Sequence, residues 1–276
     1  MVITETVLEM HYHRTLMDLI RQTYGLGSAG TFNFYKYSPQ REVFLGFDQA
    51  FAMTELTDAE FFQQMKRSAM TTGYKLPSRF LAYFLQFKVV TELRRRQKQT
   101  PAAIKSKPHY RSSLDTTKND RTGFSQHELL FRLSRNDGAM VYYACPMIFD
   151  KADLYEVNVS LDPLHLVEMA SCPSEFGDNS NHYIYFDQKT SDPIWCSEPV
   201  VGKALSPLQF AERLLEGLRQ LSSQDSAERV SNLLSKIKAM ISPSETDSKP
   251  DEAAANGLSL VADSLTVIRL DEPAEK

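Results

Sequence analysis

The distribution of apolar and polar residues along this chain predicts a mixture of helices and strands. The longest apolar run, FLAYFLQFKVV at residues 80–90, is interrupted only by Gln86 and Lys88. Such a run predicts a central strand covered on both faces. Because side chains alternate along a strand, we expect Gln86 and Lys88 to point to the same side. A lysine in such a strand needs a counter-charge or a solvent-filled cleft, which suggests a functional role.

Helices and strands alternate through the first half of the chain. Apolar positions three and four apart predict helices, and short β-branched or aromatic runs predict strands. Capping boxes mark two of the helix starts, at Thr57–Glu60 and Ser125–Glu128. The predicted order is a helix over residues 3–23, strands over 31–37 and 43–53, a helix from 57 to about 70, the strand at 80–90, a helix over 125–135 and a strand over 139–145.

The second half is richer in strands at first and then helical. The predicted strands are 157–161, 182–186 and 193–197, and the predicted helices run from 206 to about 221 and from about 226 to 241. Beyond Ser242 the composition of Ser, Pro and acidic residues predicts a disordered tail. Residues 257–270 leave open an alternative, a strand that folds back onto the domain. The fold class predicted is therefore α/β, of the α+β kind, with a mixed central sheet.

Composition narrows the class of protein. No apolar run in the 276 residues approaches the roughly 20 residues of a membrane helix, and the first residues do not resemble a signal peptide. The three cysteines form no Cys-x-x-Cys pair, which favours a reducing compartment. We therefore expect a cytoplasmic protein with no membrane partner.

The formal net charge of −4 hides an uneven distribution, because residues 242–276 carry eight acidic against three basic side chains. A basic segment follows the apolar run, and its cations are Arg94, Arg95, Arg96, Lys98, Lys105, Lys107 and Arg111. A loop of this charge suits contacts with phosphates, and a solvated loop is the alternative. The acidic tail lying over this loop is a further hypothesis.

Three short motifs stand within this order of elements: Gly46-Phe47-Asp48-Gln49, Gln86-Phe87-Lys88 and Gln126-His127. Together with the order, they resemble the PD-(D/E)XK nuclease superfamily. Without the helix at 57–70, the first 145 residues read αβββαβ, which is the core of that superfamily. Gly46-Phe47-Asp48-Gln49 resembles its acidic position on the second core strand, and Gln86-Phe87-Lys88 its (Asp/Glu/Gln)-x-Lys pair on the third. The chain is also similar to a bacterial group with a Gln-x-Lys site and a Gln-His pair, here Gln126-His127.

This resemblance implies a restriction-endonuclease-like core over residues 3–146, extended by strands at 147–205. The helical pair at 206–241 would pack on this domain, and the tail at 242–276 would follow. Proline is missing before Asp48, and glutamine replaces the usual acid at Gln86. These departures leave room for a chain that keeps the fold but binds metal poorly.

The implied site is a centre for phosphodiester hydrolysis with Mg²⁺ or Mn²⁺. Asp48, Gln86 and a helix carboxylate would hold the cation; Glu9 is the first choice for that carboxylate and Glu5 the substitute. Lys88 would orient the attacking water or neutralise charge on the phosphate. Gln126 and His127, at a helix start, would approach the same cleft and help bind an anion.

Two functions from different classes stay open on this basis. The first is a metal-dependent endonuclease that cleaves DNA, in bacterial defence or nucleic-acid processing. The second is an inactive protein of the same fold that acts as an adaptor for nucleic acid, for a protein partner or for a second copy of the chain. A third reading, an unrelated α+β enzyme, would place its pocket near His165 and His182.

Other candidate sites carry weaker patterns. His165, Cys172, His182 and Cys196 have the right number of ligands for zinc, but their spacing matches no zinc motif. The aromatic residues of the later strands are candidates for base stacking, although core packing is the commoner role; they are Tyr142, Tyr143, Tyr183, Tyr185 and Trp195.

Overall fold

In a computed structural model the chain forms two compact units. The first comprises residues 1–20, 85–119 and 123–211, and the second comprises 21–84, 120–122 and 212–276. The structure describes residues 3–24, 32–36, 78–118, 123–136, 139–155, 159–176, 181–189, 192–196, 199–222, 225–226, 228–230, 232–233, 236 and 264–271.

The predicted N-terminal helix is confirmed as α1, Glu5–Tyr24. Thr4 precedes it, and the Thr4 Oγ1 accepts a hydrogen bond from the Val7 backbone N at 3.3 Å, as an N-cap residue does. Its buried side chains recur every three or four residues, which gives one apolar face; they are Leu8, Tyr12, His13, Leu16, Met17 and Ile20. The first turn of α1 carries Glu5, a member of the site described below.

In the second unit, a strand from the C-terminal segment lies between two earlier strands. Strand β11 (Leu265–Asp271) pairs antiparallel with β1 (Phe32–Lys36) and with β2 (Ser78–Phe87). Ile268 is fully buried and opposes Phe34 on one side and Leu81 on the other. Of the two alternatives for the tail, the structure shows the strand at these residues, and the prediction of disorder is wrong there.

Strand β2 runs from the second unit into the first and ends at Phe87, so the prediction of one strand over 80–90 is wrong at its end. The Lys88 backbone N donates to the Ala144 carbonyl at 2.9 Å, whereas Val90 begins strand β3 (Val90–Leu93), which pairs with β4 (His109–Leu114). The backbone therefore changes its pairing partner at Lys88 and Val89.

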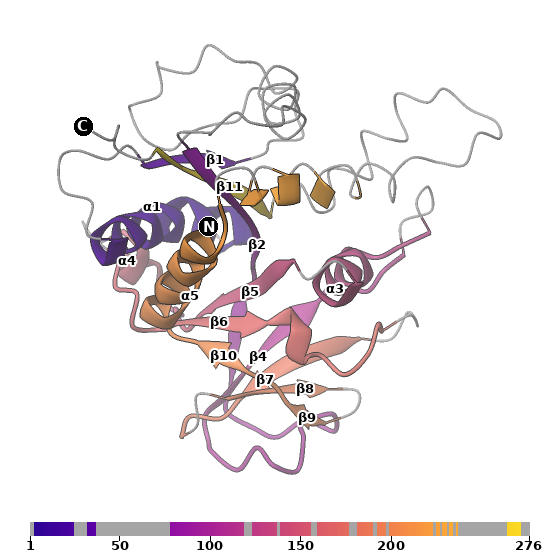
Figure 1. Cartoon of the computed structure of the whole chain (residues 1–276). Coiled ribbons are helices and arrows are strands. Elements are labelled where there is room, and N and C mark those ends of the chain that lie inside the picture. The colour runs from indigo at the N-terminus through magenta and orange to yellow at the C-terminus, as the bar shows by residue number, and fades with distance from the viewer. Residues whose placement is uncertain are drawn as a thin grey trace, which may run out of the picture. The chain divides into compact units, whose positions relative to one another are not determined.

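The first unit contains two groups of antiparallel strands (Figure 1). In one, β6 (Leu164–Glu168) pairs with β5 (Met140–Pro146) and with β10 (Ala204–Leu205). The other has the order β3–β4–β7–β8–β9, with β7 at His182–Phe186, β8 at Pro193–Cys196 and β9 at Val200–Val201.

The strands predicted at 182–186 and 193–197 are thus confirmed as β7 and β8, and that at 139–145 as β5. The strand predicted at 157–161 is wrong for Val159–Leu161, which are irregular, and the strand of this region is β6. A turn at Asp162–Pro163 lies between Val159–Leu161 and β6.

Helices α3 (Gln126–Asn136) and α5 (Pro207–Gln220) begin where the sequence predicts. At α5, Ser206 and Gln209 form a reciprocal capping box: the Gln209 N donates to the Ser206 Oγ at 3.3 Å, and the Ser206 N donates to the Gln209 Oε1 at 2.9 Å. At α3 the Glu128 N donates to the Ser125 Oγ at 3.1 Å. The short helices α4 (Lys151–Leu154) and η2 (Met169–Ser171) follow strand ends.

These elements confirm a mixed α/β fold with two sheets and several helices. The strand predicted at 43–53, with Asp48, and the helix predicted at 57–70 lie outside the described residues. The restriction-endonuclease-like core therefore stays a proposal. Among the described residues, no helix combines the length and apolar character that crossing a membrane requires.

Replacing Ile268 by alanine tests the place of β11 in the second unit. Because the side chain is fully buried between two strands, we expect Ile268→Ala to lower the free energy of unfolding in urea by about 2–4 kcal/mol. Leu208→Ala is the control, because Leu208 is 51% exposed and should cost far less. Equal, small effects of both changes would show that β11 does not contribute to the core.

Candidate functional site

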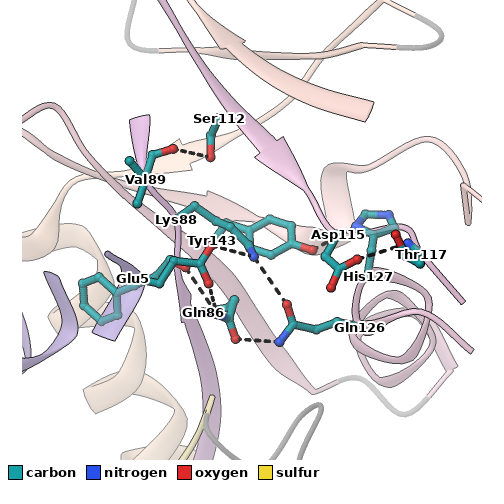
Figure 2. Close-up of polar contacts among 11 residues, drawn as sticks. Glu5, Gln86, Lys88, Val89, Ser112, Asp115, Thr117, Gln126, His127 and Tyr143 are labelled. Carbon is teal, nitrogen blue, oxygen red and sulfur yellow. Dashed lines mark hydrogen bonds and ion pairs between the residues drawn. The ribbon is translucent and has the colours of Figure 1, made fainter. Parts of the chain in front are cut away.

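Four polar side chains of the first unit close a hydrogen-bonded ring, which we call the polar ring: Glu5, Gln86, Lys88 and Gln126 (Figure 2). The Lys88 Nζ lies 3.0 Å from the Glu5 Oε1 and 3.4 Å from the Gln126 Oε1. The Gln86 Nε2 donates to the Glu5 Oε2 at 3.1 Å, and the Gln126 Nε2 donates to the Gln86 Oε1 at 3.1 Å. Residues about 40 and 80 positions apart in the sequence therefore meet at one place.

The end of β2 positions two members of the polar ring. Gln86 and Lys88 are two residues apart in extended chain and both reach Glu5, so the predicted common side is confirmed. Two hydrogen bonds hold the backbone where the strand ends: the Lys88 N donates to the Ala144 carbonyl, and the Ser112 Oγ donates to the Val89 carbonyl at 3.1 Å. Hydrogen bonds to neighbouring strands thus fix the backbone at Lys88 and Val89.

The start of α3 positions the third element of the site. Gln126 is the first residue of this helix, next to the capping residue Ser125. The following residue, His127, donates its backbone N–H to the Asp115 carbonyl at 3.2 Å, which ties the helix start to the segment after β4. The amide side chain of Gln126 is therefore presented by a fixed helix terminus.

The charge at the centre of the polar ring is buried, whereas its counter-charge is not. The Lys88 side chain is 4% exposed and the Glu5 side chain 42%. An ammonium removed from water is costly unless it is paired and hydrogen bonded. Glu5 and Gln126 supply those partners, and the Tyr143 ring lies 5.7 Å from the Lys88 Nζ at cation–π distance. Solvent reaches the ring at Glu5.

Behind Lys88, a second buried network supports Tyr143. Its hydroxyl lies 2.9 Å from the His127 Nδ1, and the His127 Nε2 lies 3.8 Å from the Cys172 Sγ. Burial lowers the pKa of His127 to about 3, so the imidazole is neutral near pH 7. Burial raises the pKa of Cys172 to about 12, which leaves a neutral thiol that is no nucleophile. This network is structural support for the polar ring.

The structure brings some predicted site residues together and separates others. Gln86, Lys88 and Gln126 meet, and the helix carboxylate that contacts them is Glu5, the substitute. Glu9, the first choice, follows one turn later on α1, and the contacts favour Glu5 over it. His127 is fully buried and faces Tyr143, so the prediction that it approaches an anion in the cleft is not supported by its contacts.

Asp48, the predicted main metal ligand, lies outside the described residues. The predicted phosphate-binding cations belong to the loop between β3 and β4, residues 94–108, together with Arg111 on β4 itself. Within this loop Arg96 donates to the loop's own carbonyls. Arg111 donates to the Gln97 Oε1 at 2.6 Å and lies over the Tyr183 ring, 4.4 Å from its centroid.

Two residues at the site were not predicted to act there. Tyr143 looked like a core aromatic residue, and its position under Lys88 depends on tertiary pairing. Asp115 is an exposed carboxylate near the Tyr143 hydroxyl in Figure 2, and its Oδ1 accepts from the Thr117 N at 3.1 Å. Nothing in the sequence around Asp115 distinguishes it from an ordinary turn residue.

The described residues alone do not complete a divalent-cation site. The polar ring offers one carboxylate, Glu5, and that carboxylate already faces the Lys88 ammonium. Mg²⁺ is usually held by one or two carboxylates with water completing the shell. Within the part of the chain that the structure describes, no three His, Cys, Asp or Glu side chains gather as a metal site. A cation here requires a further carboxylate, which Asp48 is predicted to supply.

The zinc hypothesis finds no geometric support. His165, Cys172, His182 and Cys196 are all described, and no group of three potential metal ligands drawn from the described residues includes them. His182 stacks on Phe176 at 4.2 Å between ring centroids, and His165 packs near Phe186 at 5.6 Å. These histidines are packing residues of the first unit.

No protein-family model, curated protein or solved structure matches the chain. The assignment of function therefore depends on the chemistry of the site itself.

Removing one charge of the polar ring at a time tests how its electrostatics are balanced. Glu5→Gln leaves the buried ammonium without a counter-charge, and we expect a loss of roughly 2–3 kcal/mol in the free energy of unfolding, less than a fully buried pair because water reaches Glu5. Lys88→Met removes the charge that burial penalises and should cost less. Urea unfolding measures both.

Arg94→Met is the matched control, because Arg94 pairs with Glu92 but its side chain is 88% exposed. We expect no measurable change in stability for this variant. If Lys88→Met were more destabilising than Glu5→Gln, the charge balance described for the ring would be wrong.

The lowered pKa values of two buried histidines lead us to expect a pH-dependent free energy of unfolding. Burial lowers the pKa of His13 to about 4 and that of His127 to about 3, whereas an unfolded histidine titrates near 6.5. Between these values the unfolded chain binds more protons, so stability falls as the pH drops below about 6.5, by roughly 1 kcal/mol per pH unit for each histidine. Unfolding in urea from pH 7.5 to 4.5 measures the slope. A slope unchanged in the double variant His13→Gln/His127→Gln would contradict this assignment.

Proposed function

We propose that the chain is a metal-dependent phosphodiesterase that cleaves DNA, with a site of the PD-(D/E)XK nuclease type at the polar ring. The observation that carries the proposal is the convergence of a helix carboxylate with the Gln-x-Lys pair, shown by the contacts of Glu5 with Gln86 and Lys88. The Gln126 amide joins them from α3. A cytoplasmic protein acting in bacterial defence or nucleic-acid processing stays the prediction from the sequence.

In this proposal Asp48, Glu5 and the Gln86 amide oxygen hold Mg²⁺ or Mn²⁺. A bound cation would polarise the phosphate and lower the pKa of the attacking water. Lys88 then exchanges its contact with Glu5 for one with a phosphate oxygen, where its ammonium neutralises developing negative charge. Gln126 keeps Lys88 oriented during that exchange, because its Oε1 accepts from the Nζ. The partial exposure of Glu5 gives solvent and substrate access to the ring.

A cleavage assay tests the proposal directly. Plasmid and single-stranded substrates are incubated with Mg²⁺ or Mn²⁺, with EDTA as the blank, and wild type is compared with Asp48→Ala and Lys88→Met. We expect metal-dependent cutting that falls by roughly 100-fold or more in each variant, as when one group that stabilises the transition state is removed. Glu212→Gln, an exposed acid on α5, is the control that should cut like wild type.

The same assay decides between the two helix carboxylates. Glu5→Gln should lose more activity than Glu9→Gln, because Glu5 is the one in contact with Lys88 and Gln86. DNA cleavage that persists in the Asp48→Ala and Lys88→Met variants would place the activity at another site and contradict the proposal.

The second candidate is an adaptor for nucleic acid or protein that keeps this fold without catalysis. The closed form of the polar ring favours it, since each member already has a partner within the ring. Folded wild-type protein that cuts no substrate with either metal would support the adaptor over the nuclease.

A further inference from the structure

The loop between β3 and β4, residues 94–108, is built around one of its own arginines. The Arg96 guanidinium donates to the carbonyls of Ile104, Thr100 and Pro101 at 2.9, 3.3 and 3.1 Å. The Ile104 side chain is fully buried in a cluster with Tyr185 and Ile194. The loop is therefore anchored in the core and has a defined backbone path.

An aspartate on the neighbouring segment fixes the far side of this loop. The Asp187 Oδ2 accepts hydrogen bonds from the backbone N–H groups of Lys105 and Ser106 at 2.9 and 3.1 Å. Burial alone would raise the pKa of Asp187, but these N–H donors and that of Lys189 hold it well below its usual range. The contacts of its Oδ2 with this loop are therefore to backbone N–H groups.

The anchored loop itself carries several cations and no acidic side chain. The side chains of Arg95, Lys98, Lys105 and Lys107 are exposed, and residues 94–107 contain no acidic residue. Glu92 at the start of the loop is paired with Arg94 at 2.9 Å. A fixed array of ammonium and guanidinium groups of one sign suits the phosphates of a polyanion, because little loop entropy is lost on binding.

Two aromatic rings lie beside the end of the loop. Tyr110 follows Lys107 by three residues and stacks on Phe149, with ring centroids 5.2 Å apart and planes 15° apart. Phe149 is 44% exposed, whereas Tyr143, Tyr185 and Trp195, aromatic residues that the sequence suggested for stacking, are fully buried. The acid next to Phe149, Asp150, accepts from the Ala152 N as the N-cap of α4.

We propose that this loop and the Tyr110–Phe149 pair form a platform for single-stranded nucleic acid. Phosphates would lie along Lys98, Lys105 and Lys107, and an unpaired base would stack on the exposed face of Phe149. Flat exposed aromatic rings next to a cationic track are the chemistry by which proteins bind single strands without reading sequence, since each base has a stacking face. A base paired within a duplex does not offer that face.

This inference rests on the proposed function, because it names the class of substrate that the polar ring would act on. The β3–β4 hairpin connects the two places: Val90 opposes Ser112 at the end near Lys88, and Leu93 opposes His109 at the loop end. Arg94, where the loop begins, is six positions after Lys88, a span of at most about 20 Å in extended chain. That span corresponds to about six nucleotides at the 3.4 Å spacing of stacked bases.

Binding without cleavage is the test, carried out on the full chain in EDTA by fluorescence anisotropy. The probes are a labelled 12-nucleotide DNA strand, the RNA strand of the same sequence and the DNA duplex, each at 50 and 200 mM salt. We expect both single strands to bind more tightly than the duplex. Phe149→Ala should weaken single-strand binding by about 10-fold and leave the duplex unchanged, whereas Phe149→Trp should retain binding.

The cations are tested by their salt dependence. Lys105→Ala and Lys107→Ala should weaken all probes and lower the slope of log affinity against log salt by about 0.7 each for a single strand. Val201→Ala, which truncates another exposed apolar side chain of the first unit, should change nothing and is the control for Phe149. A difference between the DNA and RNA strands identifies which nucleic acid is preferred.

The outcomes separate this inference from the proposed function. Preference for single strands that is lost in Phe149→Ala supports the platform, even if the chain cuts nothing. Duplex and single strands bound equally, with Phe149→Ala like wild type, would overturn the platform while leaving a nuclease at the polar ring intact. Absence of nucleic-acid binding by the folded chain would overturn the platform as well.

Discussion

The first unit is organised around the need to stabilise one buried ammonium group. Lys88 comes directly after a strand that is apolar on both faces, and its side chain is almost fully removed from water. A charge in that position is tolerated only if other groups surround it with opposite charge and hydrogen-bond acceptors. Glu5 comes from α1 and Gln126 from α3, so the lysine sets where both helix starts must lie relative to the end of β2.

Such an arrangement is not the most stable way to fill a core. A buried ion pair is often no more stable than apolar side chains of similar volume, because the cost of removing both ions from water offsets their attraction. Here one partner keeps contact with solvent, which lowers that cost. We expect a charged, hydrogen-bonded ring at this place to add little stability over apolar side chains, which is consistent with the role in chemistry that we propose for it.

Much of the fold follows from local rules, and the site follows only in part. The apolar run before Lys88, the alternation that brings Gln86 and Lys88 to one side, and the capping residues Ser125 and Ser206 all depend on neighbours in sequence. These features were predictable. The end of β2 at Phe87 was not, because a change of pairing partner depends on strands that come much later in the chain.

The choice between Glu5 and Glu9 shows the same limit on a finer scale. The two carboxylates are one helical turn apart on nearly the same face of α1, so periodicity cannot separate them. Which carboxylate contacts Lys88 depends on the position of α1 along its own axis relative to the end of β2. Tertiary packing sets that position. The same holds for the aromatic residues: strand position predicted which rings lie in the sheet, whereas Phe149, an exposed ring, comes from a connection after β5 that has no pattern of its own. A site built where elements meet is thus predicted by residue type and completed by packing.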